Sequence, residues 1–252
     1  MLRYQRARIV IIGATSAIAS QCARRWLAGG AAACVLLGRN AEKLAVLEAD
    51  LRLRYPLADI SSRCLDFLDV VAIEACAAEL VQGGPIDIAL IAHGNLPLQA
   101  ACQADVQLTR EALLLNAISP ALFAEAFAAR MQQQGGGCLA LISSVAGERG
   151  RKSNYVYGAA KALLSRYAEG LQHRFAGTPL HVVLIKPGPT ASPMTAHLLR
   201  SGVRLAPLGQ VADAIVAGIA KHRAVIYVPR KWALIMLLIR VLPRAIFNKL
   251  NI

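Results

Sequence analysis

A phenol and an amine lie one helical turn apart in the segment Tyr157-Gly-Ala-Ala-Lys161. Side chains four residues apart share one face of a helix, so an ammonium can lie near the phenol and favour loss of its proton. A tyrosine placed in this way can exchange a proton with a reacting oxygen, which is general acid–base chemistry. The spacing alone is weak evidence, because Tyr227 and Lys231 repeat it in a segment that contains Pro229 and follows an expected strand.

Two further polar residues are expected near this pair. Ser144 precedes Tyr157 by thirteen residues and follows an apolar run, which places it at the carboxyl end of a strand. Its hydroxyl could stabilise an oxygen on which negative charge develops. Asn116 interrupts an otherwise apolar helical segment. Together these residue types could polarise a carbonyl group and deliver a proton to it.

Elementary electrostatics sets the expected effect of Lys161 on Tyr157. A free tyrosine has a pKa of ~10, and one pKa unit corresponds to ~1.36 kcal/mol. An ammonium at ~4–5 Å in an effective dielectric of ~20 supplies ~3–4 kcal/mol. We therefore expect Lys161 to lower the pKa of Tyr157 by about two to three units, toward the pH at which acid–base catalysis works best.

A short loop near the amino terminus could hold the phosphates of a dinucleotide. The segment Gly13-Ala-Thr-Ser-Ala-Ile-Ala19 follows an apolar run and opens an Ala-rich stretch, so it is expected to join a strand to a helix. The positive end of such a helix and its free N–H groups bind phosphate. Only the first of the three small positions of the dinucleotide fingerprint is glycine, and a plain strand–turn–helix is the alternative.

Residues after the next strands indicate which dinucleotide is preferred. Arg39 lies where a carboxylate would bind the ribose of NAD, and its planar cation suits the 2′-phosphate of NADP. A solvated charge at a helix start is the alternative for Arg39. Asp66 follows the third strand and could bind the adenine amino group, or cap a helix. Ala92-His93-Gly94 ends the fourth strand, where backbone would pass under the cofactor.

Short apolar runs alternate with longer Ala- and Leu-rich segments, the pattern of repeated βαβ units. Strands are expected near residues 8–12, 33–37, 61–65, 86–91, 138–142, 180–185 and 224–228. Helices are expected near residues 16–28, 40–54, 70–81, 109–131, 153–175 and 210–221. We expect one α/β domain over residues 1–228: a Rossmann-type, doubly wound, seven-stranded parallel sheet in three α/β/α layers, in the order 3-2-1-4-5-6-7. Ligands would bind at its carboxyl edge.

These motifs resemble the short-chain dehydrogenase/reductase family over roughly residues 8–228. The resemblance implies an NADP-dependent oxidoreductase that interconverts a ketone and an alcohol. It implies that Ser144 polarises the substrate oxygen and that Tyr157 is the acid or base. It also implies that Lys161 binds the nicotinamide ribose near the phenol, while Asn116 holds a water relay.

The resemblance extends to the cofactor site, with two departures. It places Pro187-Gly188 beside the nicotinamide and Ser192 where a carboxamide-binding Thr is usual. The departures are the two alanines of the first loop and Ile91-Ala-His-Gly94, where the family has Asn-Asn-Ala-Gly. The cofactor-binding residues expected on this basis are Gly13, Thr15, Ser16, Ala17, Ile18, Arg39, Asp66, Ala92, His93, Gly94, Tyr157, Lys161, Pro187, Gly188, Thr190 and Ser192.

Within the family, the first loop and the closing segments Tyr227-Val-Pro229 and Leu242-Pro-Arg244 resemble the decaprenylphosphoryl-2-keto-ribose (decaprenylphospho-erythro-pentofuranosid-2-ulose) 2-reductases. This resemblance implies reduction of a 2-keto sugar carried on a polyprenyl phosphate. Reductases of other lipid-like ketones, of fatty-acyl, steroid or retinoid type, are the alternative. Arg200 and Arg204, in the irregular stretch 188–209, could meet a phosphate, or could be solvated loop charges.

Charge is concentrated in the tail, residues 229–252, and just before it. The 252 residues carry 28 Lys and Arg against 15 Asp and Glu, a net charge of +13, and seven of these charges follow the last acidic residue, Asp213. They flank an apolar run, Trp232 to Ile239, whose eight residues are too few to span a bilayer, which needs ~20. The tail is therefore expected to be an anchor on an anionic membrane surface, or a helix packed on the domain or on a partner subunit.

Composition excludes several function classes. A chain that is 56% hydrophobic and only 17% charged is not disordered. Nucleic-acid binding is disfavoured, because aromatic residues are 5% and the excess charge adjoins an apolar run. A non-catalytic NADP-binding module is disfavoured by the four polar residues described first.

The expected location is the cytoplasm, with a possible peripheral place at the inner face of the membrane. Four strongly apolar residues before Gly13 are too few for a signal peptide, whose apolar region has ~7–15. The cysteines show no C-x-x-C spacing, as expected for buried thiols in a reducing compartment. No metal site is expected, the substrate is expected to be a small-molecule or lipid-linked ketone, and the family resemblance implies a homodimer or homotetramer.

Overall fold

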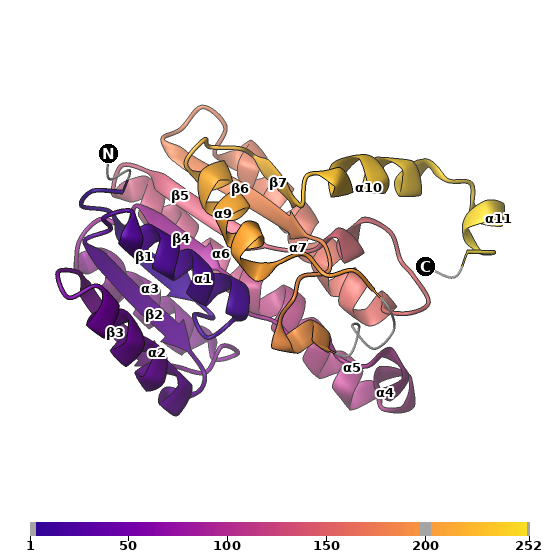
Figure 1. Ribbon diagram of the computed structural model, residues 1–252, viewed down its shortest axis with the longest axis horizontal. Coiled ribbons are helices and arrows are strands. Elements are labelled where there is room, and N and C mark those ends of the chain that lie inside the picture. The colour runs from indigo at the N-terminus through magenta and orange to yellow at the C-terminus, as the bar shows by residue number, and fades with distance from the viewer. Residues whose placement is uncertain (1–3, 197–202, 251–252) are drawn as a thin grey trace.

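The computed structural model describes residues 4–196 and 203–250, so the expectation for Arg200 lies outside the described residues. The described chain contains a seven-stranded parallel sheet in the order β3-β2-β1-β4-β5-β6-β7 (Figure 1). The predicted strand order and fold class are confirmed. The strands are β1 Arg8–Ile12, β2 Ala33–Gly38, β3 Asp59–Cys64, β4 Ile88–Ile91, β5 Gly137–Ile142, β6 Leu180–Pro187 and β7 Val225–Val228.

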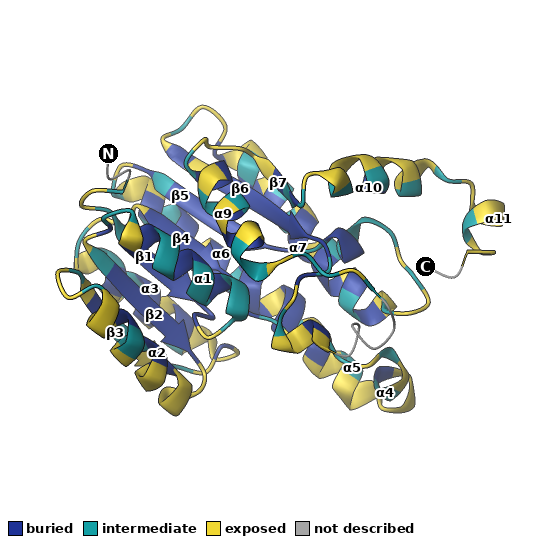
Figure 2. Cartoon of the chain, in the orientation of Figure 1, coloured by how far each residue is buried: buried dark blue, intermediate teal, exposed yellow. Residues whose placement is uncertain are grey.

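Helices cover both faces of the sheet, as Figures 1 and 2 show. One face packs against α1, α2 and α9, and the other against α3, α6 and α7. The helical segments are α1 Ala17–Ala28, α2 Ala41–Arg54, α3 Val70–Gln82, α4 Gln99–Ala104, α5 Val106–Leu113, η1 Leu114–Ile118, α6 Ser119–Gln133, η2 Val145–Glu148, α7 Tyr155–Arg174, η3 Pro193–Thr195, α9 Leu208–Ile219, α10 Lys231–Val241 and α11 Arg244–Phe247.

The apolar runs of the sequence become strands because both faces of this sheet are buried. In β1, Ile9 and Ile11 belong to the core on one face, while Val10 and Ile12 belong to the core on the other. All four side chains are fully buried. An inner strand of a parallel sheet covered on both sides therefore needs apolar residues on both of its faces, and this accounts for much of the apolar composition.

The helix expected over 109–131 is longer and less regular than predicted. It begins at Val106, where the Asp105 side chain accepts a hydrogen bond from Gln107 N at 2.8 Å. A single π-helical turn, η1, then separates α5 from α6 and contains Asn116. Such turns are frequent at functional sites, because the extra residue changes which side chain faces inward. The short helix α4 was not predicted.

A continuous helical run over Val106–Gln133, which joins α5, η1 and α6, is the one described segment long and apolar enough to cross a membrane. Two thirds of its most apolar window is buried inside the protein. It is a core helix of this fold, since it packs against α3, α7 and the sheet.

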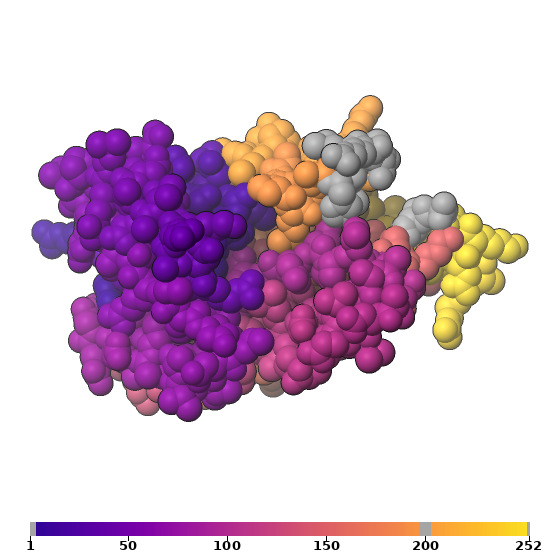
Figure 3. All heavy atoms as spheres, turned by 90° about the horizontal axis from the view of Figure 1, so that it is seen from below, coloured from indigo at the N-terminus to yellow at the C-terminus, as the bar shows by residue number. Residues whose placement is uncertain are grey.

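We call residues 231–247, which form α10 and α11, the C-terminal arm. Figures 1 and 3 place it at one end of the molecule, opposite the end formed by β3 and α2. Helix α10 packs against β7 and η2, but only Met236 of this helix is buried. Most of the arm is exposed (Figure 2).

Candidate active site

Two adjoining cavities lie at the carboxyl ends of the strands. The loop cavity is formed by the turn after β1, the start of α2 and the end of β4, and the reaction cavity by the ends of β4, β5 and β6 with α7. Together they are lined by every predicted site residue except Asp66: Gly13, Thr15, Ser16, Ala17, Ile18, Arg39, Ala92, His93, Gly94, Asn116, Ser144, Tyr157, Lys161, Pro187, Gly188, Thr190 and Ser192.

Tyr157 and Ser144 meet in the reaction cavity. Tyr157 lies in the first turn of α7, and Ser144 precedes η2 at the end of β5. Ser144 accepts a hydrogen bond from Ala146 N at 3.1 Å, which orients its hydroxyl. Burial raises the pKa of Tyr157 to about 12, while a hydrogen bond with Ser144 acts in the opposite direction. The phenol is therefore protonated at neutral pH.

Lys161 is held one turn further along α7. Its side chain is buried, and Nζ donates a hydrogen bond to the carbonyl oxygen of Ile142 at 3.1 Å. Nζ lies 5.9 Å from the centroid of the Tyr157 ring. Burial lowers the pKa of Lys161 to about 8. The pKa of Tyr157 is therefore raised and not lowered as expected, because burial disfavours the charged form of both groups.

Asn116 is fixed by hydrogen bonds on every side. Its Oδ1 accepts from Asn95 N at 2.8 Å, and its Nδ2 donates to Asn95 Oδ1 at 2.8 Å and to Ala112 O at 2.9 Å. A Cβ atom on Gly94 would lie 2.6 Å from Asn116 Oδ1 and 3.5 Å from Lys161 Nζ. Glycine at this position, with φ +150°, therefore lets the end of β4 pass between the two side chains. Asn95 was not predicted.

His93 is a buried, neutral side chain between the two cavities. Its Nε2 lies 2.9 Å from Ser119 Oγ, whose own proton is donated to Phe67 O at 2.6 Å, so Nε2 carries the ring proton. Burial, together with the charges of Lys161 and Arg39, holds the pKa of His93 well below its usual value. Within the described residues, His93 Nδ1 is buried without a partner. It remains an acceptor for a ligand.

The loop after β1 has the geometry of a phosphate cradle. Gly13 has φ +82°, and a Cβ atom there would lie 2.7 Å from His93 N and Cβ. Helix α1 begins at Ala17 without a side-chain cap or an acidic residue in its first turn, so its positive end faces the loop cavity. The small loop residues and uncapped helix end, with the unsatisfied acceptor of His93, fit a dinucleotide.

Two cations flank this loop cavity. Arg39 and Lys43 both line it, and no carboxylate lies within ion-pair distance of either in the part of the chain that the structure describes. Asn40, between them, caps α2 by accepting a hydrogen bond from Lys43 N at 2.8 Å. Lys43 was not predicted, although it stands one helical turn after Arg39 and its charge fits the same phosphate.

Asp66 is the predicted cofactor-binding residue that lines neither of the two cavities. Its Oδ1 accepts a hydrogen bond from Leu68 N at 2.9 Å. The side chain that caps α3 is Asp69, which accepts from Val71 N and Ala72 N. The adenine contact expected of Asp66 stays a prediction: one oxygen of its exposed carboxylate is engaged in a local turn, and the adjacent Phe67 lines the loop cavity.

Arg151 and Asn154 line the reaction cavity and were not predicted. Both precede α7, and in the described structure Arg151 Nε and Asn154 Oδ1 are buried without a hydrogen-bond partner. Burial lowers the pKa of Arg151. The polar run Arg149-Gly-Arg-Lys-Ser-Asn154 was the available signal. These atoms can bind polar or anionic groups of a ligand.

The C-terminal arm contacts the same end of the sheet. A Cβ atom on Gly188 would lie 2.0 Å from Trp232 Nε1, so the indole packs directly on this cavity residue. Glu148 accepts hydrogen bonds from Lys186 Nζ at 2.5 Å and Tyr227 OH at 2.9 Å, and lies 3.5 Å from Arg240 Nε. Helix α10 is thus joined to the segments that follow Ser144 and precede Gly188.

Comparison with known proteins gives a consistent result. The family model described as short chain dehydrogenase matches residues 7–201. An uncharacterized oxidoreductase of Mycobacterium tuberculosis is 34% identical over 247 residues, which are 97% of each chain. A second uncharacterized oxidoreductase, from Streptomyces coelicolor, is 31% identical over 246 residues, covering 96% of this chain and 95% of the other.

Solved structures share the fold at low sequence identity. A short chain dehydrogenase from Burkholderia cenocepacia in complex with NADP has a TM-score of 0.83 at 17% identity, with 99% of each chain covered. An actinorhodin polyketide ketoreductase with NADPH has a TM-score of 0.78 at 22% identity, covering 88% of this chain and 95% of that one.

Proposed function

The chain belongs to the short chain dehydrogenase family of oxidoreductases, and from this premise we propose that it reduces a ketone to a secondary alcohol with NADPH. The observation that carries the proposal is the meeting of four polar side chains in one cavity beside a phosphate cradle: Asn116, Ser144, Tyr157 and Lys161. The residues that this proposal assigns to chemistry are therefore those expected from the sequence.

The loop cavity is assigned to the cofactor. The turn from Gly13 to Ile18 would hold the pyrophosphate, and Arg39 with Lys43 would bind the 2′-phosphate that distinguishes NADP from NAD. When bound, the nicotinamide supplies the hydride. Structural neighbours with bound NADP or NADPH support this choice. The pair of cations also supports it, since neither has a carboxylate partner among the described residues.

Tyr157 is the proton donor. Its pKa of about 12 keeps the phenolic proton in place at neutral pH until the carbonyl oxygen of the substrate gains negative charge. Ser144 would donate a hydrogen bond to the same oxygen, an interaction worth about 2.7–4 kcal/mol in comparable sites. Lys161, held by Ile142 O, would favour the phenolate left behind.

The proposed substrate is a 2-keto sugar carried on a polyprenyl phosphate. The unpaired polar atoms of Arg151 and Asn154 suit sugar hydroxyls or a phosphate oxygen. Leu96 and Met194 add apolar surface to the same cavity. Another lipid-like ketone is the alternative, but the partly buried Arg151, whose Nε has no hydrogen-bond partner among the described residues, favours a substrate with polar or anionic groups over a purely apolar one.

The C-terminal arm is proposed to hold the enzyme at the inner surface of an anionic membrane. Leu234, Leu237 and Leu238 of α10 are exposed by 63%, 48% and 57%, although Trp232 and Met236 of the same helix pack inward. The arm and its flanks also carry exposed cations, and each would contribute ~1 kcal/mol near an anionic surface. These cations are Arg230, Lys231, Arg244 and Lys249. The membrane surface bound in this way would present a lipid-linked substrate to the enzyme.

The test is NADPH oxidation with three ketones: a 2-keto pentose on a polyprenyl phosphate, the same sugar without the lipid, and a steroid ketone. The proposal predicts the highest kcat/KM for the first. A preference for the steroid would favour the alternative substrate class. Absence of NADPH oxidation with every ketone, by protein that binds NADPH, would contradict the reductase assignment itself.

A further inference from the structure

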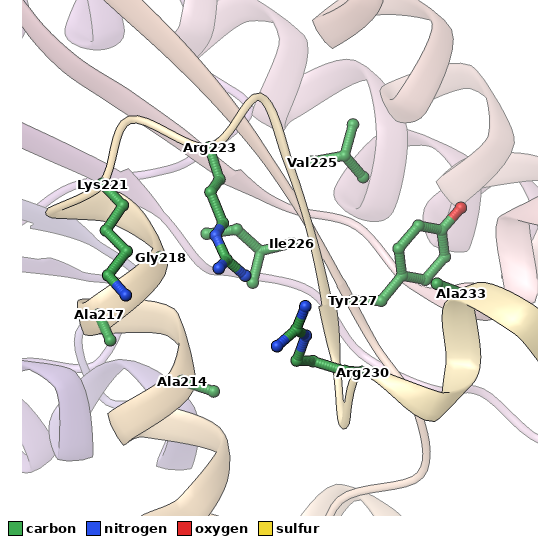
Figure 4. A pocket seen from close by; sticks show the side chains of 10 residues that line it. All are labelled: Ala214, Ala217, Gly218, Lys221, Arg223, Val225, Ile226, Tyr227, Arg230 and Ala233. Atoms are coloured by element: carbon green, nitrogen blue, oxygen red, sulfur yellow. The ribbon is translucent and has the colours of Figure 1, made fainter.

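A second concave site lies at the exposed edge of the sheet, along β7. It is a groove of about 350 Å³ between α9 and β7, bounded at one end by the first turn of α10 (Figure 4). We call it the edge groove. Among the residues described, none that lines it also lines the loop cavity or the reaction cavity. The proposed ketone chemistry does not use it.

Three cations converge on the edge groove. Lys221 follows α9, Arg223 precedes β7 and Arg230 precedes α10, and all three line the groove. Figure 4 shows Arg223 and Arg230 directed toward the space between α9 and β7, while Lys221 runs along α9 beside Ala217. Its apolar lining comes from small side chains of α9 and from Ile226. The groove therefore combines an apolar wall with three positive groups from three different elements.

These charges have no partner within the described part of the chain. No carboxylate lines the groove, and none lies within ion-pair distance of the three cations. Asp213 of α9 is engaged by Arg25 at 2.8 Å. The hydroxyl of Tyr227 donates to Glu148 at 2.9 Å and points away from the groove. Nothing described neutralises the positive charge here.

Capping of α9 does not account for these cations. The carbonyl oxygens at the end of the helix already accept backbone hydrogen bonds: Val216 O from Ala220 N at 3.1 Å, and Gly218 O from Lys221 N and Arg223 N at 3.1 and 3.2 Å. Side-chain donors are therefore not required at the helix end. Like charges held around one concavity repel each other, and a bound anion removes that cost.

We propose that the edge groove binds a phosphate group, as a phosphomonoester or a diphosphate. Two guanidinium groups can each give a phosphate two parallel hydrogen bonds, and the ammonium adds a third positive charge. A second copy of the chain is a poorer occupant, since a symmetric contact along β7 would bring two sets of the same cations together. The site does not depend on which ketone the reaction cavity reduces.

The direct test uses full-length protein saturated with NADP, so that the loop cavity does not compete for phosphate. Titration with inorganic diphosphate, followed by calorimetry, is expected to show one further site whose affinity falls as salt rises. The double variant Arg223→Gln/Arg230→Gln should bind at least about tenfold more weakly. The control Arg110→Gln removes one exposed charge on α5 and should bind as the wild type does.

Two results would overturn the proposal: no second site in the wild-type protein, or equal affinity in the double variant and the control. Equal melting temperatures of the three proteins would establish that the substitutions leave the fold intact. Their exposed side chains make this the expected result.

A vesicle-binding experiment distinguishes a lipid headgroup from a free phosphate compound as the ligand of the edge groove. If the groove takes a lipid phosphate, the single variant Arg223→Gln, which keeps Arg230 and the C-terminal arm, should bind phosphatidylglycerol vesicles more weakly than Arg110→Gln does, and diphosphate should compete with the vesicles. If it takes a free phosphate compound, the two variants should bind vesicles equally, while Arg223→Gln still binds diphosphate more weakly. Either result supports a phosphate site, whereas no effect of the substitutions on vesicle binding or on diphosphate binding contradicts it.

Discussion

Burial sets the ionisation of the two titrating groups in the reaction cavity. The spacing of Tyr157 and Lys161 predicts their proximity, but not that both lie in a poorly solvated place. Desolvation raises the pKa of the phenol to about 12 and lowers that of the amine to about 8. In the free protein the group that titrates near physiological pH is therefore Lys161, and the phenol keeps its proton.

This assignment predicts a pH profile. As pH rises through about 8, Lys161 loses the charge that favours the phenolate product, so kcat/KM for ketone reduction should fall with a limb near pH 8. The variant Lys161→Met should be slower and should lack that limb. If the limb persists at the same pH in the variant, another group causes it, and a Tyr157 of lowered pKa would be the first candidate.

Arg39 is expected to decide between the two dinucleotides. The variant Arg39→Ser removes a cation from the loop cavity, which corresponds to about 1.5–3 kcal/mol for a hydrogen bond to a charged group. We expect KM for NADPH to rise about 10- to 100-fold, with KM for NADH nearly unchanged. A similar rise for both dinucleotides would contradict a specific contact between Arg39 and the 2′-phosphate.

At the scale of elements, the sequence predicts those strands and helices that a continuous local pattern of residues determines. Six of the seven strands come from apolar runs, because the inner part of a doubly covered parallel sheet leaves no polar face, whereas the edge strand β3 is largely polar. Gly13 ends β1 where the chain must turn beside His93. The π turn at Asn116 and the helix α4 carry no comparable signal, since their geometry depends on packing. Arg151 was missed for the same reason, because it lies in an irregular segment.

The C-terminal arm is joined to two segments that border the reaction cavity, the one after Ser144 and the one before Gly188. Glu148 is buried, which acts to raise the pKa of its carboxyl, but hydrogen bonds from Lys186 and Tyr227 outweigh burial and lower it. Arg149 donates a hydrogen bond to Leu242 O at 2.7 Å, and its guanidinium lies 3.8 Å from the centre of the Phe247 ring. The inward face of the arm is therefore fastened to the segment after Ser144.

The membrane proposal is tested on the outward face of α10. The triple variant Leu234→Gln/Leu237→Gln/Leu238→Gln should lose most flotation with anionic vesicles, because it removes exposed apolar surface while Trp232 stays in place. The control changes three exposed apolar residues at the other end of the molecule to Gln and should float as the wild type does: Val46, Leu53 and Leu57. Equal flotation of protein that ends at residue 229 would rule out the anchor.

At the scale of the whole molecule, the apolar residues and the excess basic residues lie in different parts of the structure. Strands buried on both sides account for much of the apolar share, and seven net charges follow Asp213: three in the edge groove, three in the C-terminal arm and Lys249 just after it. The predicted homodimer or homotetramer remains a prediction, which light scattering of the purified protein would test.

The central claim is that Tyr157 delivers the proton in an NADPH-dependent ketone reduction, and one substitution tests it most directly. The variant Tyr157→Phe removes only the phenolic oxygen. Tyr155→Phe, an exposed position in the same helical turn, is the matched control. We predict unchanged NADPH binding in both, wild-type turnover in the control, and a loss of at least about a hundredfold in Tyr157→Phe. Turnover above a few per cent of the wild-type rate in Tyr157→Phe would contradict the account.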